Sequence, residues 1–69
     1  MPILHIVQTP GQSPEVKKEL LEKLTSTYVE VTGAKPASVW ATIEEVSKDD
    51  WSIGGETLAD RAAKAALSS

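Results

Sequence analysis

The sequence contains no cysteine, and its only histidine is His5. Without cysteine the chain can form neither a disulfide nor a thiolate metal site, and one imidazole is too few for a zinc site built from nitrogen ligands. We therefore expect no metal. A chain of 69 residues buries a modest share of its surface and usually needs an additional constraint to be stable. Since disulfides and metals are excluded, self-association is the constraint that remains.

Basic clusters and long apolar runs are also missing. Lysine and arginine total 7 against 10 acidic residues, so the net charge is −3 and nucleic-acid binding through phosphate neutralisation is not expected. No apolar run approaches the roughly 20 residues needed to cross a bilayer, and we expect no signal peptide. These absences predict a soluble cytoplasmic protein with neither nucleic acid nor membrane as a partner. We expect one domain over residues 1–69, with a helical tail at about 56–69.

The chain begins with a short apolar run. Residues 3–8, ILHIVQ, are β-branched and aliphatic and are followed by the turn residues Thr9-Pro10-Gly11, which predicts a strand. Apolar residues predominate on both faces, as in a strand that is covered on two sides. Within it, His5 is expected to be a packed or hydrogen-bonded imidazole rather than a catalyst.

A long amphipathic helix is predicted next. Ser13-Pro14-Glu15 combines a capping serine, a proline suited to the first helical position and an acid at the positive end of the dipole. Gly33 stands where a left-handed residue ends a helix. Lys18, Glu22 and Thr25 are predicted to face away from the apolar stripe. That stripe consists of Val16, Leu20, Leu24, Tyr28 and Val31.

The remainder predicts a second strand, a hairpin and a short helix. Residues 39–46 alternate in character, which predicts a strand with two unlike faces, and residues 48–50 form a polar turn. Residues 51–55 could form a tight hairpin or a bulge, because paired glycines allow positive φ. Residues 56–67 are rich in alanine and contain no helix breaker. Because a helix joins the two main strands, they should pair in parallel, leaving open edges and one bare sheet face.

Several short motifs, taken in order, resemble one known family. MPI at the start, SPE with K and L following on the helix, SVWATIEEV on the second strand and WSIGGE after it resemble the 4-oxalocrotonate tautomerase family. The resemblance runs without gaps from residue 2 to about residue 60. It implies an α/β fold, a β-α-β tautomerase-like protomer with parallel strands, a C-terminal hairpin and a short helix. It also implies a homo-oligomer, most often a hexamer built as a trimer of dimers.

The resemblance also implies a cofactor-independent isomerase whose catalyst is Pro2. The family moves a proton within enol or unsaturated oxo acids. If Met1 is trimmed, Pro2 becomes a secondary amine, and a free α-amino group has a pKa near 7.7–8.0. Such an amine can take a proton beside a carbonyl and return it as a general base and acid, and it could also form an iminium. If Met1 remains, Pro2 is an amide without basicity.

The substrate-binding positions differ from the family pattern. Gln12 and Trp40 stand where the best-known tautomerases have two arginines, and Trp51 matches the aromatic residue that lines the pocket. Loss of two charge-assisted contacts, at roughly 1.5–3 kcal/mol each, weakens recognition of a dicarboxylate by something like two to four powers of ten. We expect a flat, apolar or aromatic substrate, such as a phenylenolpyruvate-type enol acid.

Two other functions fit the same residues. A hydratase or dehalogenase of small unsaturated acids would need Glu44 or Glu45 to orient water, although neighbours on a strand point to opposite faces. A non-catalytic oligomeric member of the fold is the other alternative. Arg61 or Lys35 could supply a cation across a subunit boundary, but solvation at the surface is the expected role of both.

Overall fold

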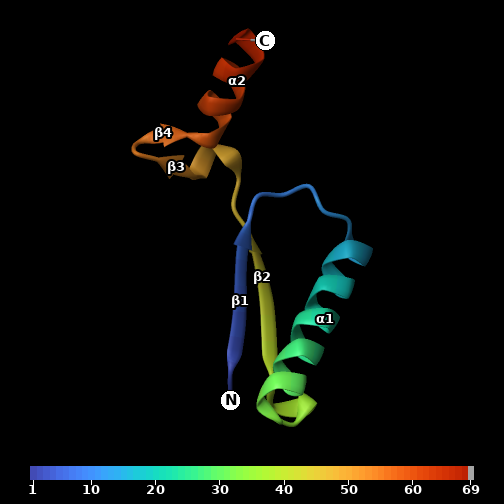
Figure 1. Cartoon of the computed structure of the whole chain (residues 1–69). Coiled ribbons are helices and arrows are strands. Elements are labelled where there is room, and N and C mark those ends of the chain that lie inside the picture. The colour runs from blue at the N-terminus through green and yellow to red at the C-terminus, as the bar shows by residue number, and fades with distance from the viewer. Residues whose placement is uncertain (69) are drawn as a thin grey trace.

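Two parallel strands and one long helix form the first two thirds of the molecule (Figure 1). The computed structural model describes residues 1–68; the last residue of the predicted tail, Ser69, lies outside the described residues. Strand β1 spans Ile3–Gln8 and strand β2 spans Trp40–Glu45. They pair in parallel from Ile3 opposite Trp40 to Gln8 opposite Glu45. The predicted parallel pair is confirmed.

Helix α1 spans Pro14–Thr32 and connects the two strands. At its start, the Ser13 hydroxyl accepts a hydrogen bond from the Val16 N–H at 3.2 Å, as a capping serine does. At its end, Gly33 has φ of 75° and donates its N–H to the carbonyl of Val29 at 2.8 Å. A non-glycine residue adopts this left-handed conformation only with strain. Both predicted ends of the helix are confirmed.

The side of α1 that faces the sheet differs from the predicted stripe. Leu20, Leu24 and Tyr28 are half-buried as expected, but Val31 is 78% exposed and Val16 is 46% exposed. Thr25, predicted to face solvent, is half-buried as well. At 3.6 residues per turn, Thr25 lies near Leu21 and Tyr28 around the helix, and both of these are half-buried. The sheet side therefore includes Thr25 and leaves Val16 outside it, whereas Val31 is exposed in the last turn of the helix.

The C-terminal part of the chain forms a small separate layer. It begins after β2 with a short 3-10 helix, η2 (Lys48–Asp50); another short 3-10 helix, η1 (Pro36–Ser38), lies before β2 and belongs to the β-α-β unit. Strands β3 (Ser52–Ile53) and β4 (Glu56–Thr57) form an antiparallel hairpin around Gly54-Gly55, and α2 spans Leu58–Ser68.

The predicted start of the tail helix at residue 56 was wrong. Glu56 and Thr57 pair with Ile53 and Ser52 as the second arm of the hairpin, and the helix begins only at Leu58. Gly54 and Gly55 have φ of 61° and 89°, which turns the chain back on itself and places these two residues in a ladder. The alanine-rich residues form a helix only after the hairpin, from Leu58 onward.

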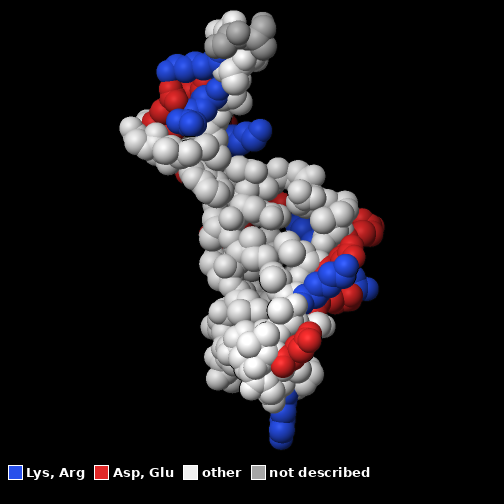
Figure 2. Space-filling model, in the orientation of Figure 1, with Lys and Arg blue, Asp and Glu red and all other residues white. Residues whose placement is uncertain are grey.

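The protomer is elongated and leaves much apolar surface uncovered. Its radius of gyration is 16.2 Å, whereas a compact chain of this length has one of about 11 Å. None of the residues that the structure describes is fully buried. One face of the sheet lies against α1, while the other exposes Ile3 (62%) and Trp40 (53%). Figure 2 shows charged side chains along α1 and around the C-terminal part, with a largely uncharged surface between them.

Candidate active site

Pro2 and Trp40 lie together at one end of the sheet. The carbonyl of Pro2 accepts a hydrogen bond from the N–H of Trp40 at 3.0 Å, which extends the parallel ladder by one step beyond Ile3. Pro2 is half-buried and Trp40 is 53% exposed. In this structure Met1 precedes Pro2, so the proline nitrogen is an amide, and Met1 itself is 80% exposed. This end of the sheet therefore joins the backbone of Pro2 to that of Trp40, whose indole is exposed.

Gln12 and Trp51 lie at the other end of the sheet. Gln12 is exposed in the loop between β1 and α1, and Trp51 follows η2 after the end of β2. The strand between the two ends has six residues, which corresponds to roughly 20 Å at 3.3 Å per residue. A single chain therefore brings Trp40 to Pro2 but not Gln12 or Trp51 (Figure 1).

A polar cluster occupies the bare face of the sheet. His5 Nδ1 lies 2.7 Å from Thr42 Oγ1, and His5 Nε2 lies 3.3 Å from Glu44 Oε2. The predicted hydrogen-bonded role of His5 is confirmed. Thr42 was missed, because only the register of the parallel pair, His5 opposite Thr42, brings the two together.

The two adjacent acids of β2 face opposite ways, as predicted. Glu44 contacts His5 on the bare face, whereas Glu45 accepts a hydrogen bond from Lys17 Nζ of α1 at 3.2 Å. Both lie near the Gln12 end of the strand pair, since they stand opposite Val7 and Gln8. In one chain, neither carboxylate is near Pro2.

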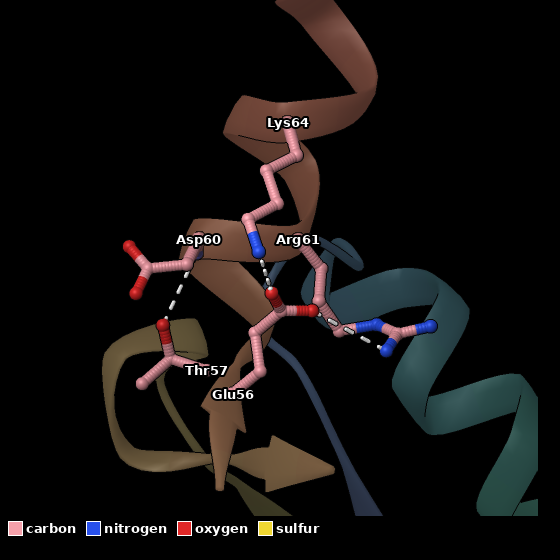
Figure 3. Close-up of polar contacts among 5 residues, drawn as sticks. All are labelled: Glu56, Thr57, Asp60, Arg61 and Lys64. Atoms are coloured by element: carbon pink, nitrogen blue, oxygen red, sulfur yellow. Dashed lines mark hydrogen bonds and ion pairs between the residues drawn. The ribbon is translucent and has the colours of Figure 1, made fainter. Parts of the chain in front are cut away.

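The two candidate cations, Lys35 and Arg61, lie beyond opposite ends of the strand pair. Arg61, on α2, has its guanidinium 3.5 Å from Glu56 Oε1, and Lys64 pairs with the other oxygen of the same carboxylate (Figure 3). Lys35 is exposed just before η1, and its carbonyl accepts hydrogen bonds from Ser38. Arg61 thus belongs to the Trp51 end of the molecule and Lys35 to the Pro2 end.

Within residues 1–68, no three His, Asp or Glu side chains are grouped so that they could hold a metal ion. In the same part of the chain, no helix is long and apolar enough to span a bilayer. Gln8 Nε2 is buried and has no hydrogen-bond partner within the described chain.

Comparison with known proteins identifies the family. A family model described as "Tautomerase enzyme" matches residues 2–61, a span that begins at Pro2 and takes in both strands, α1 and the hairpin. The chain belongs to the tautomerase family. It is an enzyme of the 4-oxalocrotonate tautomerase type, an isomerase, as the relatives and solved structures described next also indicate.

A 2-hydroxymuconate tautomerase of Comamonas testosteroni is 42% identical over 55 residues, which cover 80% of this chain and 87% of that protein. Among solved structures, TomN, a 4-oxalocrotonate tautomerase homologue in the tomaymycin biosynthetic pathway, superposes with a TM-score of 0.85. It is 31% identical, with 90% of this chain and 95% of TomN covered. A heterohexamer 4-oxalocrotonate tautomerase from Chloroflexus aurantiacus J-10-fl has a TM-score of 0.79 at 32% identity, covering 87% and 97%.

Proposed function

We propose that this tautomerase shifts a proton within enol or unsaturated oxo acids without a cofactor, and that Pro2 is its general acid and base. The observation that carries the proposal is the hydrogen bond between the Pro2 carbonyl and the Trp40 N–H at 3.0 Å. It anchors Pro2, whose nitrogen is the reactive atom, to the end of the sheet. A base held in this way can meet a flat substrate lying against the Trp40 indole.

The proton transfer follows from the chemistry of a secondary amine. The neutral Pro2 nitrogen takes the hydroxyl proton of the enol, and the oxygen lone pair forms the carbonyl as the carbon–carbon double bond opens. The electron pair of that double bond then takes the proton from the Pro2 ammonium at the neighbouring carbon. An α-amino group has a pKa near 7.7–8.0, so both protonation states are accessible near neutral pH.

Removal of Met1 is part of the proposal. A proline nitrogen within a peptide bond has no basic lone pair, so the enzyme becomes active only when Met1 is absent. Met1 is 80% exposed, and so is open to an aminopeptidase. We propose that Met1 is removed in the cytoplasm after synthesis. We also propose that residues 1–69 of the translated chain form one tautomerase-like domain.

We further propose that a complete site is built from more than one chain. Pro2 and Trp40 lie roughly 20 Å from Gln12 and Trp51 within a protomer, a span set by the six-residue strand. A neighbour that brings its Gln12 and Trp51 to the Pro2 end would close the site. The elongated protomer favours such an assembly, and a homohexamer of three dimers is the arrangement we propose.

The substrate we propose carries one carboxylate and an aromatic or apolar body. Gln12, Trp40 and Trp51 present amides and indoles but no charge, so a second carboxylate would find no fixed cation among them. The Comamonas relative is named for 2-hydroxymuconate, a dicarboxylate. We expect this enzyme to prefer phenylenolpyruvate over 2-hydroxymuconate by about two powers of ten or more in kcat/KM, because two charge-assisted contacts are absent.

Pro2→Ala tests the catalyst. Intact mass first establishes that Met1 is absent from both proteins. Ketonisation of phenylenolpyruvate should fall in Pro2→Ala, where a flexible primary amine replaces the secondary amine held in the proline ring, and should be unchanged in Glu30→Gln, an exposed position on α1. Equal rates in the two variants would overturn the role of Pro2. Comparable kcat/KM values for phenylenolpyruvate and 2-hydroxymuconate would overturn the substrate proposal alone.

A further inference from the structure

An apolar groove runs between the start of α1 and strand β2. It has a volume of about 480 Å³ and is bordered on the helix side by Lys18 and Glu22, which stand one turn apart. Its floor is formed by Leu21, Ala41 and Ile43. The side chains of Lys18 and Glu22 make no ion pair within residues 1–68. The groove is therefore apolar inside and carries one unpaired charge of each sign on its rim.

Helix α2 presents a matching surface. One side of the helix carries Ala59, Ala63, Ala66 and Leu67, and of these Leu67 is 87% exposed. Asp60 and Lys64 border this apolar side and also stand one turn apart. Figure 3 shows the Asp60 carboxylate turned away from Glu56, Arg61 and Lys64. A helix of 11 residues is marginal in water unless its apolar side is packed, so this side requires a covering surface.

We propose that the groove between α1 and β2 of one chain receives helix α2 of a second copy. Aligning the helices in parallel places Asp60 against Lys18, and it places Lys64, which also pairs with Glu56 of its own chain, against Glu22. Both rim charges then meet their opposites one turn apart. In the same register Ala63 meets Leu21, and the small alanine side chains let the helix approach closely. The chain cannot fill its own groove, because α2 points away from the β-α-β unit (Figure 1).

Most of the helix that would enter the groove lies outside the region that the family model matches. The family model ends at residue 61, so Ala63, Ala66 and Leu67 lie beyond the matched region. Each copy offers one groove and one helix, which makes the contact head-to-tail, and head-to-tail contacts close into rings when the rotation permits. The contact is independent of the reaction at Pro2 and adds a tail-in-groove connection between neighbouring protomers.

Charge reversal tests the proposal. The concentration at which the assembly dissociates should rise about 10-fold in Lys18→Glu and in Asp60→Lys, since each replaces attraction with repulsion. The double variant should return to within about threefold of the native value. Sedimentation equilibrium measures this, with Glu30→Lys as a reversal on α1 away from the groove. A native midpoint in the single variants, or a double variant no better than either single one, would overturn the proposal.

Removal of residues 62–69 provides a second test that does not depend on charge. The shortened chain keeps the whole matched region, so its sheet and α1 should give an unchanged circular dichroism signal apart from the lost helix. Its assembly should dissociate at a concentration at least about 10-fold higher than that of the native chain. If the shortened chain assembles as tightly as the native one, another surface, such as the bare face of the sheet, holds the copies together and the proposal fails.

Discussion

The β-α-β unit and the C-terminal part of the same chain are stabilised by contacts of different range. In the first, six residue pairs join strands that lie 37 positions apart, and a 19-residue helix closes over them. In the second, two residue pairs form the hairpin, and the Leu58 N–H donates to the Trp51 carbonyl at 2.8 Å. We therefore expect a local change in the β-α-β unit to affect the whole fold, and the C-terminal part to open by itself.

The largest effect is expected in the β-α-β unit at Leu24. This side chain is half-buried on the sheet side of α1, so Leu24→Ala should lower the free energy of unfolding by about 2 kcal/mol, at the low end for a leucine removed from a packed position. Urea unfolding at one fixed protein concentration measures it. Val31→Ala on the same helix is the matched control, because Val31 is 78% exposed, and it should change the value by less than about 0.5 kcal/mol.

If Val31→Ala costs as much as Leu24→Ala, then the outer side of α1 is covered in the assembly. The β-α-β unit would in that case depend on neighbours in the same way as the C-terminal part.

Most of the β-α-β unit could be predicted because its signals are local. A capping serine, a proline and a C-terminal glycine mark the helix, and alternation marks β2. The phase of the helix was predicted less well, since the stripe was extended to Val31 while the sheet side passes through Thr25. Residues 56–57 were assigned to the helix because alanine content carries no information about a ladder that forms across Gly54-Gly55.

The candidate site was harder to predict than the fold. Pro2 and Trp40 could be named from the sequence, but their hydrogen bond depends on strand register, which no local pattern determines. Gln12 and Trp51 could likewise be named, yet the length of β1 places them at the far end. Residues of different chains meet only where the surfaces of two protomers pack together, and the sequence of one chain does not show how they pack. The roles of these four residues remain predictions.

The second prediction compares two glycines that both have positive φ, one in the β-α-β unit and one in the C-terminal part. Gly33 has φ of 75° and Gly54 has φ of 61°, and a Cβ at either position meets no other atom within 4 Å. Alanine at either site therefore costs backbone strain alone, about 1 kcal/mol.

For Gly33→Ala this cost should appear in global urea unfolding, because α1 packs on the sheet. For Gly54→Ala it should appear as faster hydrogen exchange confined to residues 52–60, with global stability nearly unchanged. A global loss of equal size in both variants would show that the hairpin unfolds together with the sheet.

The third prediction compares the two capping side chains. Ser13 Oγ accepts from the Val16 N–H at 3.2 Å at the start of α1, and Thr57 Oγ1 accepts from the Asp60 N–H at 3.1 Å at the start of α2. Ser13→Ala should lower the free energy of unfolding by about 0.5–1 kcal/mol. Thr57→Ala should leave that value within about 0.3 kcal/mol and instead reduce the protection of α2 amides, because that helix opens separately. Loss of α1 amide protection in Thr57→Ala would contradict this separation.

The smallest effect is expected at Glu56, whose carboxylate pairs with both Arg61 and Lys64 (Figure 3). The side chains are 31%, 50% and 72% exposed, so water screens both pairs and their joint contribution should be less than about 0.5 kcal/mol. Glu56→Gln should therefore speed hydrogen exchange in α2 about twofold at low salt, and the difference should vanish near 1 M salt, where charges are screened within about 3 Å. Glu19→Gln is the control, since it removes the exposed Glu19–Lys23 pair of α1. A Glu56→Gln effect that persists in high salt would mean that Glu56 acts through the hairpin ladder rather than through charge.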